Sequence, residues 1–238
     1  MNTYRPTKLL ESAEEVAMFV ERRGFLPFFH GEIEDFSLEE CVVPRYWFPD
    51  DEEGVWEWKS AVIAMADCAY GKFYRQKACW VSMAWFPDLV NYRRQLYPLT
   101  ADEVRVLDIL QRNESLLSHE LKRMCGYTSA RAAVCKSTAE PALAVEPSHG
   151  KKRGSFETII NKLQMSGRVL ISNFEYSTDR RGNSYGWGRA RYCTPEAFFG
   201  TDRMQTGRTP EQSRQLLEDY LIELLPTAER AAVQRILG

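Results

Sequence analysis

The chain has little that would build a covalent or metal framework. Its 238 residues include six cysteines, none in a C-x-x-C spacing, and only three histidines, His30, His119 and His149. Disulfide scaffolds and structural zinc sites normally show clustered cysteines or histidines. We therefore expect reduced thiols, no metal centre and no cofactor.

Long apolar runs and export signals are also missing. The longest stretch without a charged residue is the ten residues 78–87, about half of the roughly 20 needed to cross a bilayer. The first ten residues lack the positive start, apolar middle and small-residue cleavage site of a secretory signal. We expect no membrane span, and the cytoplasm is the expected compartment.

The familiar signatures of nucleotide, acyl-transfer and zinc-protease chemistry are absent too. The sequence holds no G-x-x-x-x-G-K-[ST], G-x-G-x-x-G, G-x-S-x-G or H-E-x-x-H motif. Each of these patterns builds a specific phosphate-binding loop, nucleophile turn or metal-binding helix. Function therefore has to be inferred from charge and from predicted architecture.

The overall charge conceals a strong asymmetry. The formal net charge of the chain is -2, but residues 1–60 hold 14 acidic and 6 basic residues, a net charge of -8. Residues 151–192 hold 9 basic and 3 acidic residues, a net charge of +6. This asymmetry predicts two functional regions with a polyanion facing the second. A merely solvated basic face is the plain alternative.

The first region is predicted to be a compact mixture of helices and short strands. A capping box from Ser12 to Glu15 precedes an amphipathic helix, and residues 24–31 indicate a helix end followed by an apolar loop. Residues 56–66 and 85–94 predict helices, and residues 70–74 and 79–83 predict strands. Five of the six tryptophans lie in this region, which suits a packed aromatic core.

The second region predicts a winged helix-turn-helix. A capping box formed by Thr100 and Glu103 starts one helix, Ser118 can cap a second, and apolar residues from 156 to 163 recur at i, i+3, i+4 and i+7 in a third. Residues 168–176 and 184–192 then predict a hairpin with a basic turn. Three helices followed by a hairpin is the order of a winged helix, and the last helix of a helix-turn-helix reads the major groove.

The predicted fold class is α+β, mainly α. The expected order is a mixed, aromatic-rich region over residues 1–97, a winged helix-turn-helix domain over 98–200 and a C-terminal tail over 201–238. Residues 127–154 show no sustained period, so we predict an inserted loop there. Residues 210–225 and 227–237 are predicted as two C-terminal helices that pack back on the body.

Candidate nucleic-acid contacts come from the third helix and the hairpin. Long cationic side chains at a hairpin tip reach phosphates, although charge there also discourages aggregation. On an outward helix face Asn and Gln suit adenine edges and Lys suits guanine or phosphate, and a plain solvated face is equally compatible. The candidates are Lys151, Lys152, Arg153, Asn161, Lys162, Gln164, Arg180, Arg181, Arg189 and Arg191.

Aromatic residues supply the candidates for a pocket. Glu57 stands between Trp56 and Trp58, and a carboxyl in an apolar aromatic pocket can have its pKa raised and act as a general acid or base. Glu57 is therefore the one candidate for catalysis, with Trp56, Trp58, Tyr70 and Lys72 as pocket candidates. The alternative is that these aromatic residues are simply core. Likewise, Gly186 and Gly188 either make room for Trp187 to pack on the core, which we favour, or admit a ligand that stacks on it.

Several motifs carry a resemblance to a known family. They are Trp56-Glu-Trp-Lys59, Ala69-Tyr-Gly-Lys-Phe73, Lys77 to Ser82, Trp85-Phe-Pro-Asp88, Asn91-Tyr-Arg-Arg94, Leu163-Gln-Met165 and Tyr185-Gly-Trp187. Together they resemble the AlkZ-related branch of the winged-helix superfamily that includes the AlkZ/YcaQ crosslink-repair DNA glycosylases. The resemblance spans about residues 12–200 and is most specific over 56–94.

The resemblance implies a bacterial winged-helix architecture that binds DNA, with base excision as the activity of the best-known relatives. Those relatives carry a catalytic Gln-x-Gln pair, whereas no two glutamines of this chain are separated by one residue. From the resemblance we therefore expect the fold and the DNA affinity of the family in this chain, but we assign no catalytic residue from it.

The leading hypothesis is a non-enzymatic protein that binds double-stranded DNA. One alternative is a DNA glycosylase with a divergent active site at Glu57, where an extruded base would stack on the tryptophans. The other is a winged helix that binds protein, with the acidic first region as the partner surface.

Overall fold

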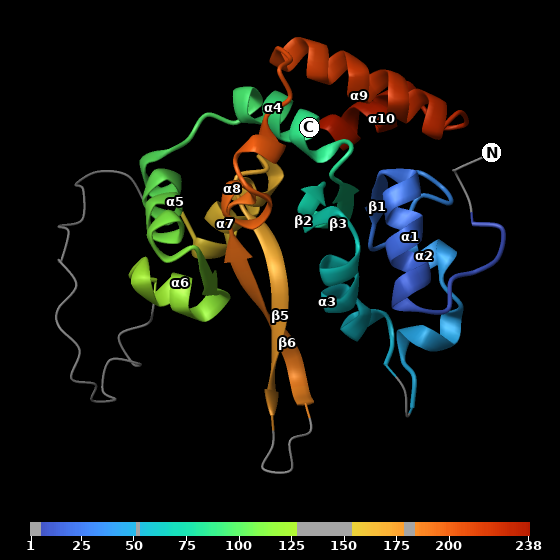
Figure 1. The fold of residues 1–238 in the computed structure, drawn as a ribbon, viewed down its shortest axis with the longest axis horizontal. Helices are drawn as coiled ribbons and strands as arrows, with labels where there is room; N and C mark the ends of the chain where they lie inside the picture. Colours follow the sequence, from blue (N-terminus) through green and yellow to red (C-terminus); the bar gives the residue numbers. More distant parts are fainter. Residues whose placement is uncertain (1–5, 51–52, 128–153, 179–183) are drawn as a thin grey trace.

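A computed structural model of the chain describes residues 6–50, 53–127, 154–178 and 184–238 (Figure 1). It begins with helix α1 (Ala13–Arg23), whose first turn is capped by Ser12 through a hydrogen bond that the Ser12 hydroxyl accepts from the backbone N–H of Glu15. The helix ends at Gly24, which has a φ of 80°. Both ends are as the sequence predicted.

The first sheet lies beside α1. It consists of β1 (Phe25–Pro27), β2 (Cys68–Tyr74) and β3 (Lys77–Ser82), antiparallel in the order β1-β3-β2. The prediction of a loop over residues 24–31 was wrong for β1. Proline discourages the prediction of a strand, but Pro27 lies on an edge strand, where it is tolerated.

Four helical segments complete the first region. They are α2 (Leu38–Cys41), the 3-10 helix η1 (Pro44–Trp47), α3 (Val55–Met65) and α4 (Phe86–Leu96). The predicted helices over 56–66 and 85–94 are thereby confirmed as α3 and α4. The sequence did not indicate α2 and η1, which are only one turn long.

The second sheet contains the predicted hairpin and one strand that was not predicted. Helix α5 (Ala101–Asn113) is followed by β4 (Ser115–Leu117), α6 (Ser118–Met124), α7 (Phe156–Met165), β5 (Leu170–Thr178) and β6 (Ser184–Cys193). The three strands are antiparallel in the order β4-β6-β5. Ser118 is the first residue of α6 and not its cap. Instead, the carboxylate of Glu120 accepts the backbone N–H of Leu117 at 3.0 Å.

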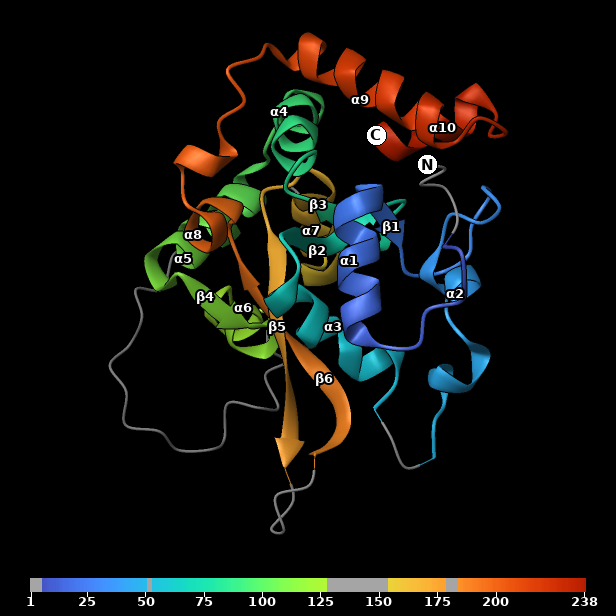
Figure 2. The same cartoon turned by 45° about the vertical axis from the view of Figure 1, so that its right-hand side comes forward.

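The C-terminal helices pack back on the body, as predicted. After α8 (Pro195–Phe199) and the 3-10 helix η3 (Asp202–Met204), helices α9 (Pro210–Leu224) and α10 (Arg230–Leu237) lie across α4 (Figures 1 and 2). Arg93 of α4 is fully buried and donates to the carbonyl oxygens of Leu237 and Ile236, both at 2.7 Å. The last turn of α10 is therefore held by a charged side chain from the middle of the chain.

Two hydrophobic clusters join the predicted regions. In the first, Tyr70 and Trp80 share a core with Ile160 and Leu163 of α7. In the second, Phe86 of α4 packs with residues of the hairpin and of α9 and α10. Full burial of each large apolar side chain contributes about 1.5–3 kcal/mol, so the regions stabilise one another. The predicted mixed α+β class is confirmed, with two small antiparallel sheets, and the boundaries at 97 and 200 stay predictions.

None of the described helices is both long and apolar enough to span a membrane.

Candidate nucleic-acid interface

Helix α7 buries its apolar face and exposes a polar stripe. Phe156, Ile159, Ile160 and Leu163 are at most 4% exposed, which confirms the periodicity read from the sequence. The hydroxyl of Ser155 caps the helix and accepts the backbone N–H of Thr158 at 3.1 Å. The exposed stripe consists of Ser155, Thr158 and Lys162, with Glu157, also exposed, and the half-buried Asn161 at its edge.

Gln164 does not face outward, and that prediction is wrong. Its side chain is fully buried; Oε1 accepts the backbone N–H of Lys72 at 3.0 Å, and Nε2 donates to the carbonyl of Ile160 at 3.3 Å. In the turn between β2 and β3, the backbone N–H of Gln76 donates to the sulfur of Met165 at 3.3 Å. The first sheet therefore covers the last turns of α7, a surface that helical periodicity alone predicted to be exposed.

A cleft of about 280 Å³ lies beside α7, where the two predicted regions meet. Lys72 of β2 lines the cleft, and burial lowers the pKa of its amine. The ammonium of Lys122 is 2.6 Å from a carboxylate oxygen of Glu157. The lining residues are Lys72 from β2, Ser118, His119 and Lys122 from α6, Phe156, Glu157, Ile160 and Asn161 from α7, and Tyr192 from β6.

Two residues of this cleft, Lys72 and Asn161, were candidates from the sequence, but nothing in the sequence connected them. His119 and Lys122, which lie on the predicted second helix, were not predicted. Their basic character was the only available signal, because the cleft is formed by α6, α7 and β2, which are segments far apart in the chain.

One face of the β5–β6 hairpin packs on the first region. The hydroxyl of Tyr176 donates to the carbonyl oxygen of Trp56 at 3.1 Å, and the ammonium of Lys59 lies 4.4 Å from the centre of the Phe174 ring. A Cβ on Gly188 would approach Cζ of Tyr176 to 2.8 Å. Gly188 thus makes room for Tyr176 across the hairpin. We predicted that Gly186 and Gly188 make room for Trp187, but the side chain of Trp187 lies outside the described residues.

The other face of the hairpin carries Arg189 and Arg191, two residues apart on β6 and therefore on the same side. Arg189 is exposed and donates to the hydroxyl of Ser177 at 3.4 Å. Arg191 donates through Nε to a carboxylate oxygen of Glu175 at 2.9 Å, so its charge is balanced within the protein. Arg189 is the more available of the two. The other cationic candidates, Lys151, Lys152, Arg153, Arg180 and Arg181, lie outside the described residues.

Glu57 does not lie in an aromatic pocket, and that expectation is wrong. Its side chain is exposed, and Oε2 accepts the backbone N–H of Gly54 at 3.1 Å, which caps α3. Successive helical residues point about 100° apart. Glu57 therefore points to solvent, while its neighbours face the protein.

The aromatic pocket candidates are core or packed against it. Trp58 is 6% exposed and packs on Tyr46, with ring centres 5.0 Å apart. Trp56 donates through Nε1 to the carbonyl of Trp47 at 3.1 Å. Tyr70 is 4% exposed, and burial raises the pKa of its hydroxyl. Of the four pocket candidates, only Lys72 lines one of the two clefts described here.

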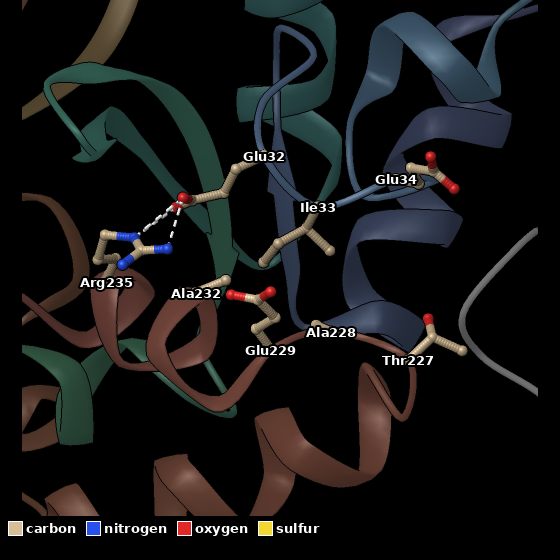
Figure 3. A pocket seen from close by; sticks show the side chains of 8 residues that line it. All are labelled: Glu32, Ile33, Glu34, Thr227, Ala228, Glu229, Ala232 and Arg235. Carbon is tan, nitrogen blue, oxygen red and sulfur yellow. Dashed lines mark hydrogen bonds and ion pairs between the residues drawn. The ribbon is translucent and has the colours of Figure 1, made fainter.

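A second, acidic cleft of about 360 Å³ separates residues 32–34 from α10 (Figure 3). Arg235 pairs with Glu32 at 2.7 Å, and this hydrogen-bonded pairing lowers the pKa of the Glu32 carboxyl. Glu34 and Glu229 also line the cleft, which is therefore negatively charged. The acidic partner surface predicted for the first region stays a prediction.

The cysteines of the described residues are all buried, at positions 41, 68, 79, 125 and 193, and those at 41, 68, 79 and 193 are free thiols. Burial raises the pKa of the Cys79 and Cys193 thiols to about 12, which leaves them protonated and unreactive at neutral pH. The described residues contain no group of three or more His, Cys, Asp or Glu side chains able to hold a metal ion.

These features define a mixed α+β protein in which a helical unit with a β-hairpin is packed against a smaller antiparallel sheet. A family model described as AlkZ related matches residues 10–238, and the chain therefore belongs to the AlkZ-related family. The resemblance inferred from the sequence is confirmed. No curated protein and no solved structure matches the chain significantly.

Proposed function

We propose that the protein binds duplex DNA through a winged helix formed by residues 101–193. The observation that carries this proposal is the order α5, β4, α6, α7, β5, β6, together with the pairing of β4 to β6 beside the hairpin. A helix-turn-helix presents its last helix to the major groove, which is the role we assign to α7. Membership of the AlkZ-related family supports DNA as the ligand, because it suggests a relation to DNA-repair glycosylases.

The exposed stripe of α7 supports a groove contact. Thr158 and Lys162 are short or flexible polar side chains without a covering element, and lysine suits guanine edges or phosphate. Because β2 covers Gln164, we assign groove contacts to the first two turns of α7 and to Asn161 and Lys162. Arg189, and by sequence Lys151, Lys152, Arg153, Arg180 and Arg181, would contact the phosphate backbone.

We propose that the protein binds DNA without excising a base. The only catalytic candidate from the sequence, Glu57, caps a helix and is exposed. Release of free base from alkylated or crosslinked duplex by the wild-type protein would contradict this part of the proposal.

Fluorescence anisotropy with a labelled duplex tests the binding. We expect Lys162→Gln to weaken binding. If Lys162 contacts a base, the loss should be about 1–3 kcal/mol at one preferred base pair. If it contacts a phosphate, the slope of log K against log salt should become shallower by about 0.9. Lys8→Gln makes the same change in net charge at the start of the chain, where Lys8 pairs with Glu15 at 2.7 Å. This control should bind like the wild type. Equal losses in both variants would contradict the assignment of α7, and no binding by the wild type in dilute salt would contradict the function.

A further inference from the structure

The cleft beside α7 is lined by a lysine without a counter-charge among the described residues. Lys72 comes from β2 in the acidic first region, and burial is the one cause that shifts its pKa, downward. No carboxylate among the described residues pairs with it. Partial burial of a cation without a partner costs free energy, and such groups are typical of binding sites.

Two further groups surround the same volume. The ammonium of Lys122 lies on the α6 side, and its partner Glu157 has a side chain that is 63% exposed. Asn161 lies on the α7 side, where its Oδ1 is shielded from solvent and accepts no hydrogen bond from the described residues. Rotation of this amide about the Cβ–Cγ bond would present its two N–H donors instead.

We infer that this cleft is a phosphate-binding site in which Lys72 is the principal cation, with Lys122 and the amide of Asn161 as further donors. Three donors from three elements, β2, α6 and α7, converge on the cleft. Glu157 is the one carboxylate among the lining residues, and its charge is already balanced by Lys122. The cleft therefore keeps the net positive charge that a phosphate requires.

The position of the cleft identifies the source of the phosphate. Glu157 and Asn161, which line it, border the stripe of α7 that we assign to the major groove. The backbones on either side of that groove run past the flanks of the inserted helix, and most phosphate contacts fix its position there. The ligand is a backbone phosphate of the bound duplex, and this identification rests on the proposed function. The packing of β2 on α7 then delivers a lysine from an otherwise acidic region to the DNA.

Salt-dependent duplex binding tests the DNA source. Lys72→Gln should lower the slope of log K against log salt by about 0.9 and weaken binding about eightfold at 0.1 M salt, as expected for one phosphate contact. Lys77→Gln is the matched control, because Lys77 lies in the same hairpin but donates to the carbonyl of His30 at 3.5 Å, outside the cleft. The affinity of Lys77→Gln for the duplex should differ less than twofold from that of the wild type. Equal effects of the two substitutions, or no effect of Lys72→Gln, would overturn the contact.

Inorganic phosphate tests the cleft independently of DNA. In ¹H–¹⁵N spectra recorded at constant ionic strength, phosphate should shift the side-chain amide of Asn161 saturably in the wild type and in Lys72→Arg. It should not do so in Lys72→Gln, whose backbone N–H still bonds Gln164 and whose fold is checked by the rest of the spectrum. A shift without any duplex binding would retain the phosphate site and refute DNA as its source. No shift with either phosphate or duplex would refute the site itself.

Discussion

The side-chain oxygen of Gln164 accepts the backbone N–H of Lys72 at 3.0 Å, although the two residues are 92 positions apart. This contact lays the edge of the first sheet over the end of α7. The helix that we assign to DNA recognition is therefore not free-standing, because the acidic first region holds it in place. Changes in the first sheet are expected to reach the DNA-binding surface.

Substitution of Gln164 by leucine tests this coupling. The backbone N–H of Lys72 would lose its acceptor, and an unsatisfied buried donor costs about 1–3 kcal/mol. We expect a loss of that size in the free energy of unfolding, measured with urea. Lys162→Leu, an exposed position in the same helix, should change stability by less than about 0.5 kcal/mol. If both variants are equally stable, the hydrogen bond does not hold α7.

Arg93 joins the ends of two helices. In addition to its bonds to the last turn of α10, it donates to the carbonyl oxygen of Met165 at the end of α7, at 2.9 Å. Burial lowers the pKa of Arg93 to about 10, so it remains charged at neutral pH. A cation at the C-terminal ends of helices also interacts favourably with their dipoles.

Arg93→Met should therefore be among the most destabilising single substitutions in the chain. It leaves the carbonyl oxygens of Leu237, Ile236 and Met165 without this donor, and each buried polar group left unsatisfied costs about 1–3 kcal/mol. Urea unfolding measures the loss, and Arg112→Met at an exposed position of α5 is the control, expected within about 0.5 kcal/mol of the wild type. A loss below about 1 kcal/mol would show that solvent replaces these contacts.

The pairing of Glu32 with Arg235 predicts a dependence of stability on pH. The pKa of Glu32 is lowered in the folded protein, so the ion pair stabilises the fold above the unfolded pKa of about 4.3. This stabilisation is lost as the pH falls through the lower, folded pKa. We expect Glu32→Gln to be less stable than the wild type at pH 7, with a smaller difference at pH 3.

The control for this comparison is Glu229→Gln. Glu229 lines the same acidic cleft but is not hydrogen-bonded to Arg235 (Figure 3). Because it removes a charge from the same cleft and leaves the Glu32–Arg235 pair intact, Glu229→Gln should cost less stability at pH 7 than Glu32→Gln. A Glu32→Gln difference that is as large at pH 3 as at pH 7 would argue against the ion pair as its cause.

Local signals in the sequence predicted the elements that depend on local chemistry. Capping boxes at Ser12 and Thr100 gave the starts of α1 and α5, the apolar spacing over residues 156–163 gave α7, and β-branched and aromatic residues on either side of a turn-rich segment gave the hairpin. The start of α3 shows that a signal was overlooked. Glu57 is three residues after Gly54, a spacing that predicts a carboxylate capping the helix and facing solvent.

The candidate site could not be assembled in the same way. Lys72, Lys122 and Asn161 share one cleft because β2 and α6 both pack on α7, and these contacts join segments separated by tens of residues. The same packing buries Gln164, which helical periodicity placed on an open face. Nothing local to residue 164 signals that a strand covers it.

Residues 101–193 are proposed to form a winged helix that contacts the DNA backbone, with Arg180 and Arg181 at the predicted tip of the wing. The most direct test compares duplex affinity over a range of salt concentrations for the wild type and the double variant Arg180→Ala/Arg181→Ala. We predict salt-dependent binding by the wild type and a slope reduced by about 1.8 in the variant, as expected for two lost phosphate contacts. Unchanged affinity and slope in the variant, or no binding by the wild type in dilute buffer, would rule out this winged helix as a DNA-binding element.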